Sequence, residues 1–261
     1  MSLKHCIPEK IRAWLFWRRA KILAVIKKAG HKFGLGRFIW KLSLPSETSF
    51  WEEYLATRGK SCGAMEEFNF RTSPDAELQP WLKEWMKCPA GAEVRVLDVG
   101  AGPLTWVGKK WSGHKVVIDA IDPLAEAYGQ MLRRQGIQPP VATQPGDGEK
   151  VVQLFGREVF DLTFARNSLD HSYDAIQAVT SMIEATKPGG IIFLWHNQNE
   201  AERLCYQGLH QWNFRLDRTE LLVWKGDKTL NVNRAFAGQL QVLRCELRDD
   251  MIQAIYRKVS T

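Results

Sequence analysis

The chain has 261 residues, which is enough for one α/β domain and an appendage. Its hydrophobic content of 45% and aromatic content of 11% exclude a disordered protein. The net charge of +7 is unevenly distributed, because residues 1–41 contain eleven Lys or Arg and a single acid, Glu9, whereas the rest of the chain carries a net charge of −3. The composition therefore indicates a mildly acidic domain with a basic N-terminal arm.

The five cysteines are scattered and lack the CxxC spacing of a zinc or redox motif. They are Cys6, Cys62, Cys88, Cys205 and Cys245. This usage favours reduced thiols in a cytoplasmic protein over a disulfide framework. The N-terminus also lacks the apolar core and cleavage site of a signal peptide, so we expect a cytoplasmic location.

Apolar residues of the arm fall on one face of a predicted helix between residues 8 and 42. They are Ile11, Trp14, Leu15, Ile22, Val25, Ile26, Ala29 and Phe33. No uncharged run approaches the ~20 residues needed to cross a bilayer. Three interpretations remain open: peripheral contact of residues 8–41 with an anionic membrane surface, packing on a protein surface, and contact with nucleic acid. The first would place the protein on the inner membrane face.

Two helices are predicted after the arm. Leu44-Pro45-Ser46 indicates a joint, and a helix is expected from Thr48 or Ser49 to Gly59. A second helix is expected from Ser73-Pro74-Asp75, where a serine cap precedes proline. We therefore divide the chain into a basic arm (1–44), a helical cap segment (45–93) and a main domain (94–261).

The main domain starts with a strand and a glycine loop. Val94 to Val99 is short, apolar and β-branched, which is typical of a buried parallel strand. It runs into Gly100-Ala101-Gly102, and a helix is expected to follow, as at the nucleotide corner of a doubly wound sheet. A dinucleotide fingerprint would need a third glycine where the chain has Thr105. Asp98, just before the loop, suits a cationic ligand such as the sulfonium and ammonium of S-adenosylmethionine.

Further strands and helices alternate along the chain. Strands are expected at 115–122, 139–144, 160–165 and 191–195, with a helix from Tyr173 to Thr186. Asp122 ends the second strand, 24 residues after Asp98, near the spacing at which an acid meets ribose hydroxyls. Two antiparallel hairpins are expected at 221–232 and 241–256.

Two blocks resemble the class I S-adenosylmethionine-dependent methyltransferases. Val96 to Pro103 is similar to their motif I, and Asp161 to His171 is similar to motif IV. The resemblance covers residues 94–261 and implies an α/β fold: a doubly wound, mostly parallel seven-stranded Rossmann-like sheet. An antiparallel C-terminal hairpin and an N-terminal helical extension complete the expected fold.

The resemblance also implies that the chain binds S-adenosyl-L-methionine. The residues expected at the cofactor are Asp98, Gly100, Ala101, Gly102, Asp122, Pro123, Asp147, Arg166, Asn167 and Arg71. In this assignment Asp147, or alternatively Glu149, accepts from the adenine amino group. Arg71 either reaches the cofactor carboxylate or is an ordinary surface ion-pair partner.

Three histidines lie where they could act as the base: His171 first, then His196, then His210. Asp170 could orient a histidine or serve as the base itself. A metal held by Asp170, His171 and His196 is conceivable, but the spacing is not diagnostic, so we expect no metal.

The stretch 206–214 is dense in amides and aromatic rings. Such residues could bind a sugar, or they could be buried aromatic side chains of the protein interior. Three longer segments, residues 97–105, 165–172 and 208–214, resemble a bacterial subgroup of type 11/12 methyltransferases. This subgroup is associated with surface-polysaccharide or small-molecule biosynthesis. We therefore expect O-methylation of a sugar, glycan or small-molecule hydroxyl. The alternatives are a non-catalytic S-adenosylmethionine-binding protein and an RNA or protein methyltransferase recruited by the basic arm. A nucleic-acid acceptor is disfavoured by the −3 charge of the main part of the chain. The oligomeric state is left open.

Overall fold

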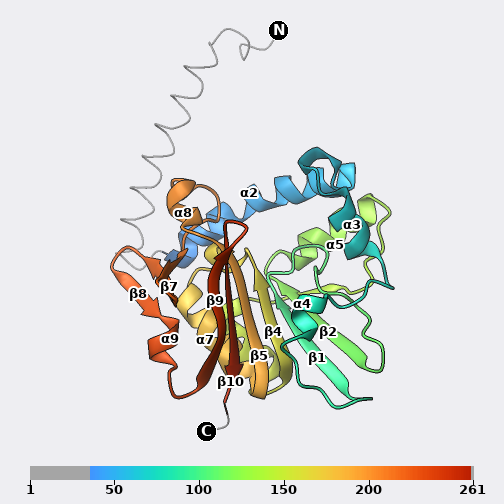
Figure 1. Ribbon diagram of the computed structural model, residues 1–261. Coiled ribbons are helices and arrows are strands. Elements are labelled where there is room, and N and C mark those ends of the chain that lie inside the picture. Colours follow the sequence, from blue (N-terminus) through green and yellow to red (C-terminus); the bar gives the residue numbers. More distant parts are fainter. Residues whose placement is uncertain (1–35, 260–261) are drawn as a thin grey trace.

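The computed structural model of the protein describes residues 36–259 and is built around a seven-stranded sheet (Figure 1). The strand order is β3-β2-β1-β4-β5-β10-β9. The strands are β1 (Glu93–Val99), β2 (Lys115–Asp122), β3 (Thr143–Pro145), β4 (Phe160–Arg166), β5 (Thr186–Asn197), β9 (Leu240–Arg248) and β10 (Met251–Lys258). The first five pair in parallel, whereas β10 is antiparallel to both β5 and β9. This topology confirms the fold class expected from the sequence.

Both faces of the sheet are buried, which explains the continuous apolar run of β1. Val94 and Val96 pack on one face with Leu162 and Phe193, whereas Leu97 and Val99 pack on the opposite face. The helices are α2 (Gly36–Thr57), α3 (Met65–Thr72), α4 (Pro80–Lys83), α5 (Ala125–Arg134), α6 (Val151–Phe155), α7 (Ala175–Ala185), α8 (Glu200–Arg203) and α9 (Val232–Ala235). The helix expected over 173–186 is therefore α7.

The first C-terminal hairpin forms a separate structure. Strands β6 (Asn213–Asp217), β7 (Glu220–Lys225) and β8 (Lys228–Asn231) make a three-stranded antiparallel sheet that packs on the same core as α7. The second hairpin, β9 and β10, completes the main sheet. Both hairpins were predicted, but their assignment to two different sheets was not.

The helix expected after Gly102 is wrong: residues 100–114 run to β2 as a loop. Its place on the sheet is taken by residues 76–86, whose Leu78 and Leu82 are fully buried against the sheet. The Gln79 side chain donates to the Trp106 carbonyl (2.6 Å) and accepts from the Gly108 amide (3.1 Å). A Cβ on Gly108 would lie 2.1 Å from the Glu77 carbonyl oxygen, so glycine permits this close approach.

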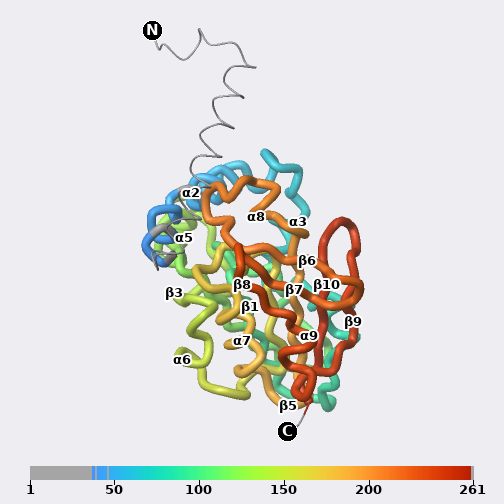
Figure 2. Tube along the Cα trace, turned by 90° about the vertical axis from the view of Figure 1, so that its left-hand side faces the viewer, coloured from blue at the N-terminus to red at the C-terminus, as the bar shows by residue number. Residues whose placement is uncertain are grey.

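The joint expected at Leu44-Pro45-Ser46 is also wrong, because Pro45 lies inside the continuous helix α2. Proline removes one helical hydrogen bond, but buried side chains on both sides of it, Trp40 and Tyr54, hold the helix to the protein. Helix α2 lies across one end of the main sheet (Figures 1 and 2). The helix expected from Ser73 is reduced to the short α4.

The predicted arm helix falls mostly on residues 1–35, which lie outside the described residues. In the part of the chain from 36 to 259, no helix has the length and hydropathy required to cross a membrane. Cys62, Cys88, Cys205 and Cys245 are free thiols in the structure.

Candidate functional site

A cavity, here called cavity A, lies at the carboxyl ends of β1, β2 and β4 beneath helix α2. Of the ten residues expected at the cofactor, all except Asp98 line it. They are Arg71, Gly100, Ala101, Gly102, Asp122, Pro123, Asp147, Arg166 and Asn167. The structure thus brings together residues that are up to 96 positions apart in the sequence. The role assigned to each of them stays a prediction.

The glycine loop owes its shape to two left-handed residues, Gly100 (φ 71°) and Gly102 (φ 64°). The Gly100 and Ala101 amides both donate to the Ile121 carbonyl (2.9 and 3.1 Å). A Cβ on Gly100 would lie 2.3 Å from the Ser168 Cβ, and one on Gly102 would lie 2.7 Å from the Trp51 ring. The loop is therefore packed between β2, the Ser168 turn and α2.

Asp122 combines burial with two backbone contacts. Its Oδ1 accepts from the Leu124 amide (2.9 Å) and its Oδ2 accepts from the Gly102 amide (3.2 Å). Burial raises its pKa to about 7. Each carboxylate oxygen still has a lone pair for a further donor, so the side chain is suited to bind the two hydroxyls of a ribose.

Asp98 does not line cavity A, contrary to the expectation that it faces a cationic ligand. It is only 3% exposed, and its Oδ2 accepts a 2.6 Å hydrogen bond from the Thr105 hydroxyl. Thr105 Oγ1 in turn accepts from the Val107 amide (3.1 Å). Asp98 therefore fixes the loop that begins at Gly100. It does so through Thr105, which stands where a dinucleotide fingerprint would have its third glycine.

Asp147 and Glu149 both line cavity A. The Lys150 ammonium donates to Asp147 (2.8 Å), whereas Glu149 Oε1 accepts from the Asp174 amide (2.9 Å). Burial raises the pKa of Glu149 to about 7. Both candidates for the adenine contact thus line the cavity.

Two arginines in the wall share one carboxylate. Glu67 accepts from Arg71 (2.9 Å) and from Arg166 (3.1 Å), and Arg71 also donates to the Leu104 carbonyl. Arg166 lies 4.1 Å from the centre of the Trp106 ring. Because two guanidinium groups face one acid, this group keeps a net positive charge for an anionic ligand. Arg71 is 93% buried, so it is not the surface ion-pair partner of the alternative interpretation.

Sequence analysis missed the contribution of helix α2. Trp40, Glu47 and Trp51 line cavity A, and the Trp51 ring nitrogen donates to Glu47 (2.9 Å). Their spacing of seven and four residues places them on one face of a helix, which is the available signal. This spacing was not recognised because the helix was predicted to be interrupted at Pro45.

A second cavity, cavity B, adjoins cavity A. Shared walls come from Glu47, Trp51, Arg71, Arg166, Asn167, His171 and Leu209. In the stretch 206–214, residues Gln207 to His210 line cavity B, as a substrate-binding segment would. Gln211 to Phe214 are instead buried in the core. Cavity B therefore has both aromatic and amide groups in its wall.

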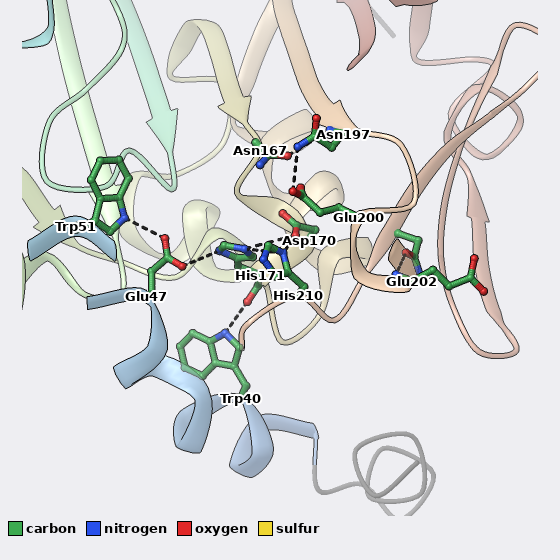
Figure 3. A network of polar contacts seen from close by, with 11 residues as sticks. Trp40, Glu47, Trp51, Asn167, Asp170, His171, Asn197, Glu200, Glu202 and His210 are labelled. Atoms are coloured by element: carbon green, nitrogen blue, oxygen red, sulfur yellow. Dashed lines mark hydrogen bonds and ion pairs between the residues drawn. The ribbon is translucent and has the colours of Figure 1, made fainter. Parts of the chain in front are cut away.

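Asp170, His171 and His210, here called the Asp–His cluster, lie together (Figure 3). His171 lines both cavities, His210 lines cavity B alone, and Asp170 is buried and lines neither. His210 Nδ1 is 2.7 Å from Asp170 Oδ2 and 3.0 Å from His171 Nε2. Burial alone would raise the pKa of Asp170, but the two histidines outweigh it and the pKa is lowered. Burial by itself would lower the pKa of His210. The hydrogen bond to Asp170 outweighs this effect, and the pKa of His210 is raised.

His196 is set apart from the other two histidines. It is 2% exposed, lines neither cavity and stacks on Phe214 with ring centres 4.1 Å apart. Burial lowers its pKa to about 4, so it is neutral at physiological pH. The structure thus brings His171, His210 and Asp170 together, whereas His196 is buried outside both cavities.

The sheet order, the antiparallel strand β10 and the glycine-loop cavity define a class I S-adenosylmethionine-dependent methyltransferase. Residues 97–194 match the family described as methyltransferase domain. The cofactor of the domain is S-adenosyl-L-methionine. No curated protein matches the sequence significantly.

Several solved structures are similar to part of this chain at low sequence identity. The YcgJ protein of Bacillus subtilis is 16% identical, with 69% of this chain and 97% of that chain covered and a TM-score of 0.41. An S-adenosylmethionine-dependent methyltransferase from Clostridium acetobutylicum is 14% identical, with 64% and 85% covered and a TM-score of 0.39. A 16S rRNA methyltransferase of T. thermophilus, solved with AdoMet and guanosine, is 16% identical, with 69% and 38% covered and a TM-score of 0.37.

Proposed function

We propose that this protein transfers the methyl group of S-adenosylmethionine to a hydroxyl oxygen of a sugar, glycan or small molecule bound in cavity B. The observation that carries the proposal is the place of His171, because it lines both the cofactor cavity and cavity B and lies beside Asp170 and His210. A sulfonium methyl in cavity A and an acceptor in cavity B would meet where the two cavities adjoin.

The chemistry explains why such a cluster is needed there. Methyl transfer is an in-line displacement, so the protein mainly positions the two reactants. A hydroxyl is a poor nucleophile until its proton is removed or its oxygen is polarised. If a histidine acts as general base, the geometry favours His210, since Asp170 holds its Nδ1 and leaves Nε2 for the proton of the acceptor.

The wall of cavity B supports a polyhydroxylated acceptor. Asn167, Asn197 and Gln207 provide amide groups, and Trp51 and Phe50 provide flat aromatic faces. Amides can pair with hydroxyl groups as donors and acceptors, while aromatic faces pack against the C–H faces of sugar rings. The proposal of surface-polysaccharide biosynthesis rests on this wall together with the sequence resemblance.

The test is transfer of isotopically labelled methyl groups from S-adenosylmethionine to a bacterial extract, with the product identified by mass spectrometry. Replacing Gln207, which lines cavity B but not cavity A, with Trp is expected to lower transfer at least tenfold and leave the dissociation constant of the cofactor unchanged. Gln130→Trp, at an exposed position away from both cavities, is the matched control. Label on nitrogen or on RNA would contradict the proposal, and cofactor binding without any transfer would favour a non-catalytic protein.

We also propose that the N-terminal part contacts an anionic membrane surface. The first turns of α2 expose Phe38 (61%) and Leu42 (67%), which are four residues apart and lie on one face. Arg37 and Lys41 are exposed next to them. Together with the basic sequence of residues 1–41, this is the composition of a helix that lies in the interface of an anionic bilayer.

Exposed apolar residues at the start of α2 should therefore contribute to lipid binding. The full chain is expected to float with phosphatidylglycerol vesicles at low salt, and the double change Phe38→Ser and Leu42→Ser should reduce the bound fraction severalfold. Leu154→Ser removes a comparably exposed leucine (48%) from α6 and should have no effect. Equal flotation of all three proteins, or binding that ignores the lipid charge, would contradict membrane contact through this face.

A further inference from the structure

The Asp–His cluster has the geometry of a metal-binding group. Three potential ligand atoms face one another: Asp170 Oδ2, His171 Nε2 and His210 Nδ1. Their separations are 2.7, 3.0 and 3.5 Å. Atoms that each lie about 2.0–2.2 Å from one ion are themselves roughly 3 Å apart, so this triangle has the size of one face of a coordination shell.

Hydrogen bonding among these three atoms leaves them incompletely paired. When His171 carries its proton on Nδ1, the single proton on His210 Nδ1 lies between Asp170 Oδ2 and the lone pair of His171 Nε2. The other oxygen of Asp170, Oδ1, is buried and accepts no hydrogen bond within residues 36–259. A cation between the three atoms would give each of them a full partner, and Oδ1 is a second oxygen that the same ion could use.

The surroundings hold the three side chains in this arrangement. The Asp170 carbonyl accepts from the Gln211 and Trp212 amides (2.9 and 3.0 Å), which fixes the segment of His210 against that of Asp170. The Trp40 ring nitrogen donates to the His171 carbonyl (2.6 Å). These contacts come from segments far apart in the sequence, so the cluster is built by the fold.

His171 also faces a carboxylate on the side away from the other two ligand atoms. Its second nitrogen, Nδ1, is 3.7 Å from Glu47 Oε2, and Glu47 is held by the Trp51 ring nitrogen (Figure 3). A carboxylate on the far side of an imidazole keeps the proton on Nδ1 and directs the Nε2 lone pair to the metal. Helix α2 therefore supplies the outer support of the site.

We propose that Asp170, His171 and His210 bind one divalent first-row transition-metal ion. Two imidazole nitrogens and one carboxylate oxygen suit ions in the range from Mn²⁺ to Zn²⁺, whereas Mg²⁺ and Ca²⁺ prefer oxygen ligands. This departs from the expectation of no metal, and it places His210 where the sequence had suggested His196. The distance of 39 residues between His171 and His210 hid the group from sequence analysis.

The catalytic role of the ion rests on the proposed function. With three protein ligands the ion keeps open positions, and both histidines line cavity B. An acceptor hydroxyl bound there loses its proton to water more readily, because the ion stabilises the alkoxide. The oxygen then forms the bond to the methyl carbon as the carbon–sulfur bond breaks, and S-adenosylhomocysteine leaves. The ion thus replaces a histidine as the activating group.

The test uses the full chain, produced without a histidine tag and stripped with a chelator. Calorimetric titration with Zn²⁺ is expected to show one site of micromolar or tighter affinity, and Mg²⁺ should not bind. Co²⁺ should give a visible absorption spectrum that Zn²⁺ abolishes. His171→Ala and His210→Ala should each weaken Zn²⁺ binding at least hundredfold. His114→Ala removes a histidine outside the cluster and should bind as the wild type does.

Circular dichroism of each variant shows whether the protein is still folded, and this readout does not depend on cavity A, which His171 lines. Zn²⁺ binding that is absent in the wild type, or unchanged in both cluster variants, would overturn the metal site. If methyl transfer proceeds at full rate in the stripped protein without Zn²⁺, the catalytic role of the ion is wrong while the proposed function stands. Tight Zn²⁺ binding without any transfer would keep the site and reject the proposed function.

Discussion

Replacing Asp122 with alanine is expected to weaken S-adenosylmethionine binding about hundredfold. In the predicted ribose contact, the change removes two hydrogen bonds from the hydroxyls to a charged acceptor, and a loss of about 3 kcal/mol corresponds to that factor. It also removes the partner of the Gly102 and Leu124 amides at the rim of the cavity. Isothermal titration with the cofactor measures the effect.

Asp119→Ala is the matched control for this change. Asp119 lies on the same strand, but its carboxylate is paired with Arg95 (3.0 Å) and does not line cavity A. If Asp119→Ala weakens cofactor binding as much as Asp122→Ala does, the assignment of the ribose to Asp122 is wrong.

Asp122 should also make cofactor binding depend on pH. Its pKa in the free protein is about 7 because of burial, and only the ionised carboxylate accepts from both hydroxyls. The affinity for the cofactor should therefore reach its maximum above pH 8, and it should fall by up to tenfold per pH unit below pH 6.5. Glu149 has a similar pKa in the same cavity, so comparison with Asp122→Asn isolates the contribution of Asp122. Equal pH profiles of the two proteins would contradict it.

Gly100→Ala is expected to destabilise the protein by about 2–5 kcal/mol and to abolish tight cofactor binding. The left-handed backbone costs a non-glycine residue about 1–2 kcal/mol, and overpacking against Ser168 adds about 1–3 kcal/mol. For a domain of this size the melting temperature should fall by roughly 5–15 °C. Thermal unfolding followed by circular dichroism gives the value.

Gly113→Ala separates the two contributions. Gly113 has a similar φ of 79°, but a Cβ there meets nothing within 4 Å, so the substitution carries only the backbone cost. The double change Gly100→Ala and Ser168→Gly removes the atom that the new methyl would strike and should recover part of the stability. No recovery in the double variant would show that the contact with Ser168 is not the cause.

The strand-and-loop corner at 94–102 and both C-terminal hairpins could be predicted because their signals are local. Alternating or continuous apolar runs define the strands, and glycines mark the turns between them. The expectation of S-adenosylmethionine came from Asp98, from Thr105 in place of a third glycine, and from the resemblance of residues 96–103 to motif I. Local signals failed at Pro45 and after Gly102, where packing of Trp40, Tyr54, Leu78 and Leu82 outweighed the preferences of the backbone.

The residues along the chain thus specify a methyltransferase sheet and most of the wall of its cofactor cavity, since strand ends collect at one edge of a parallel sheet. Three features arise only from the tertiary structure: the loop that replaces the first helix, the cover formed by α2, and the Asp–His cluster. Each depends on contacts between segments far apart in the sequence, such as His210 with Asp170 and Glu47 with His171. No local pattern encodes which distant segments will meet, because the burial of apolar surface over the whole fold decides it.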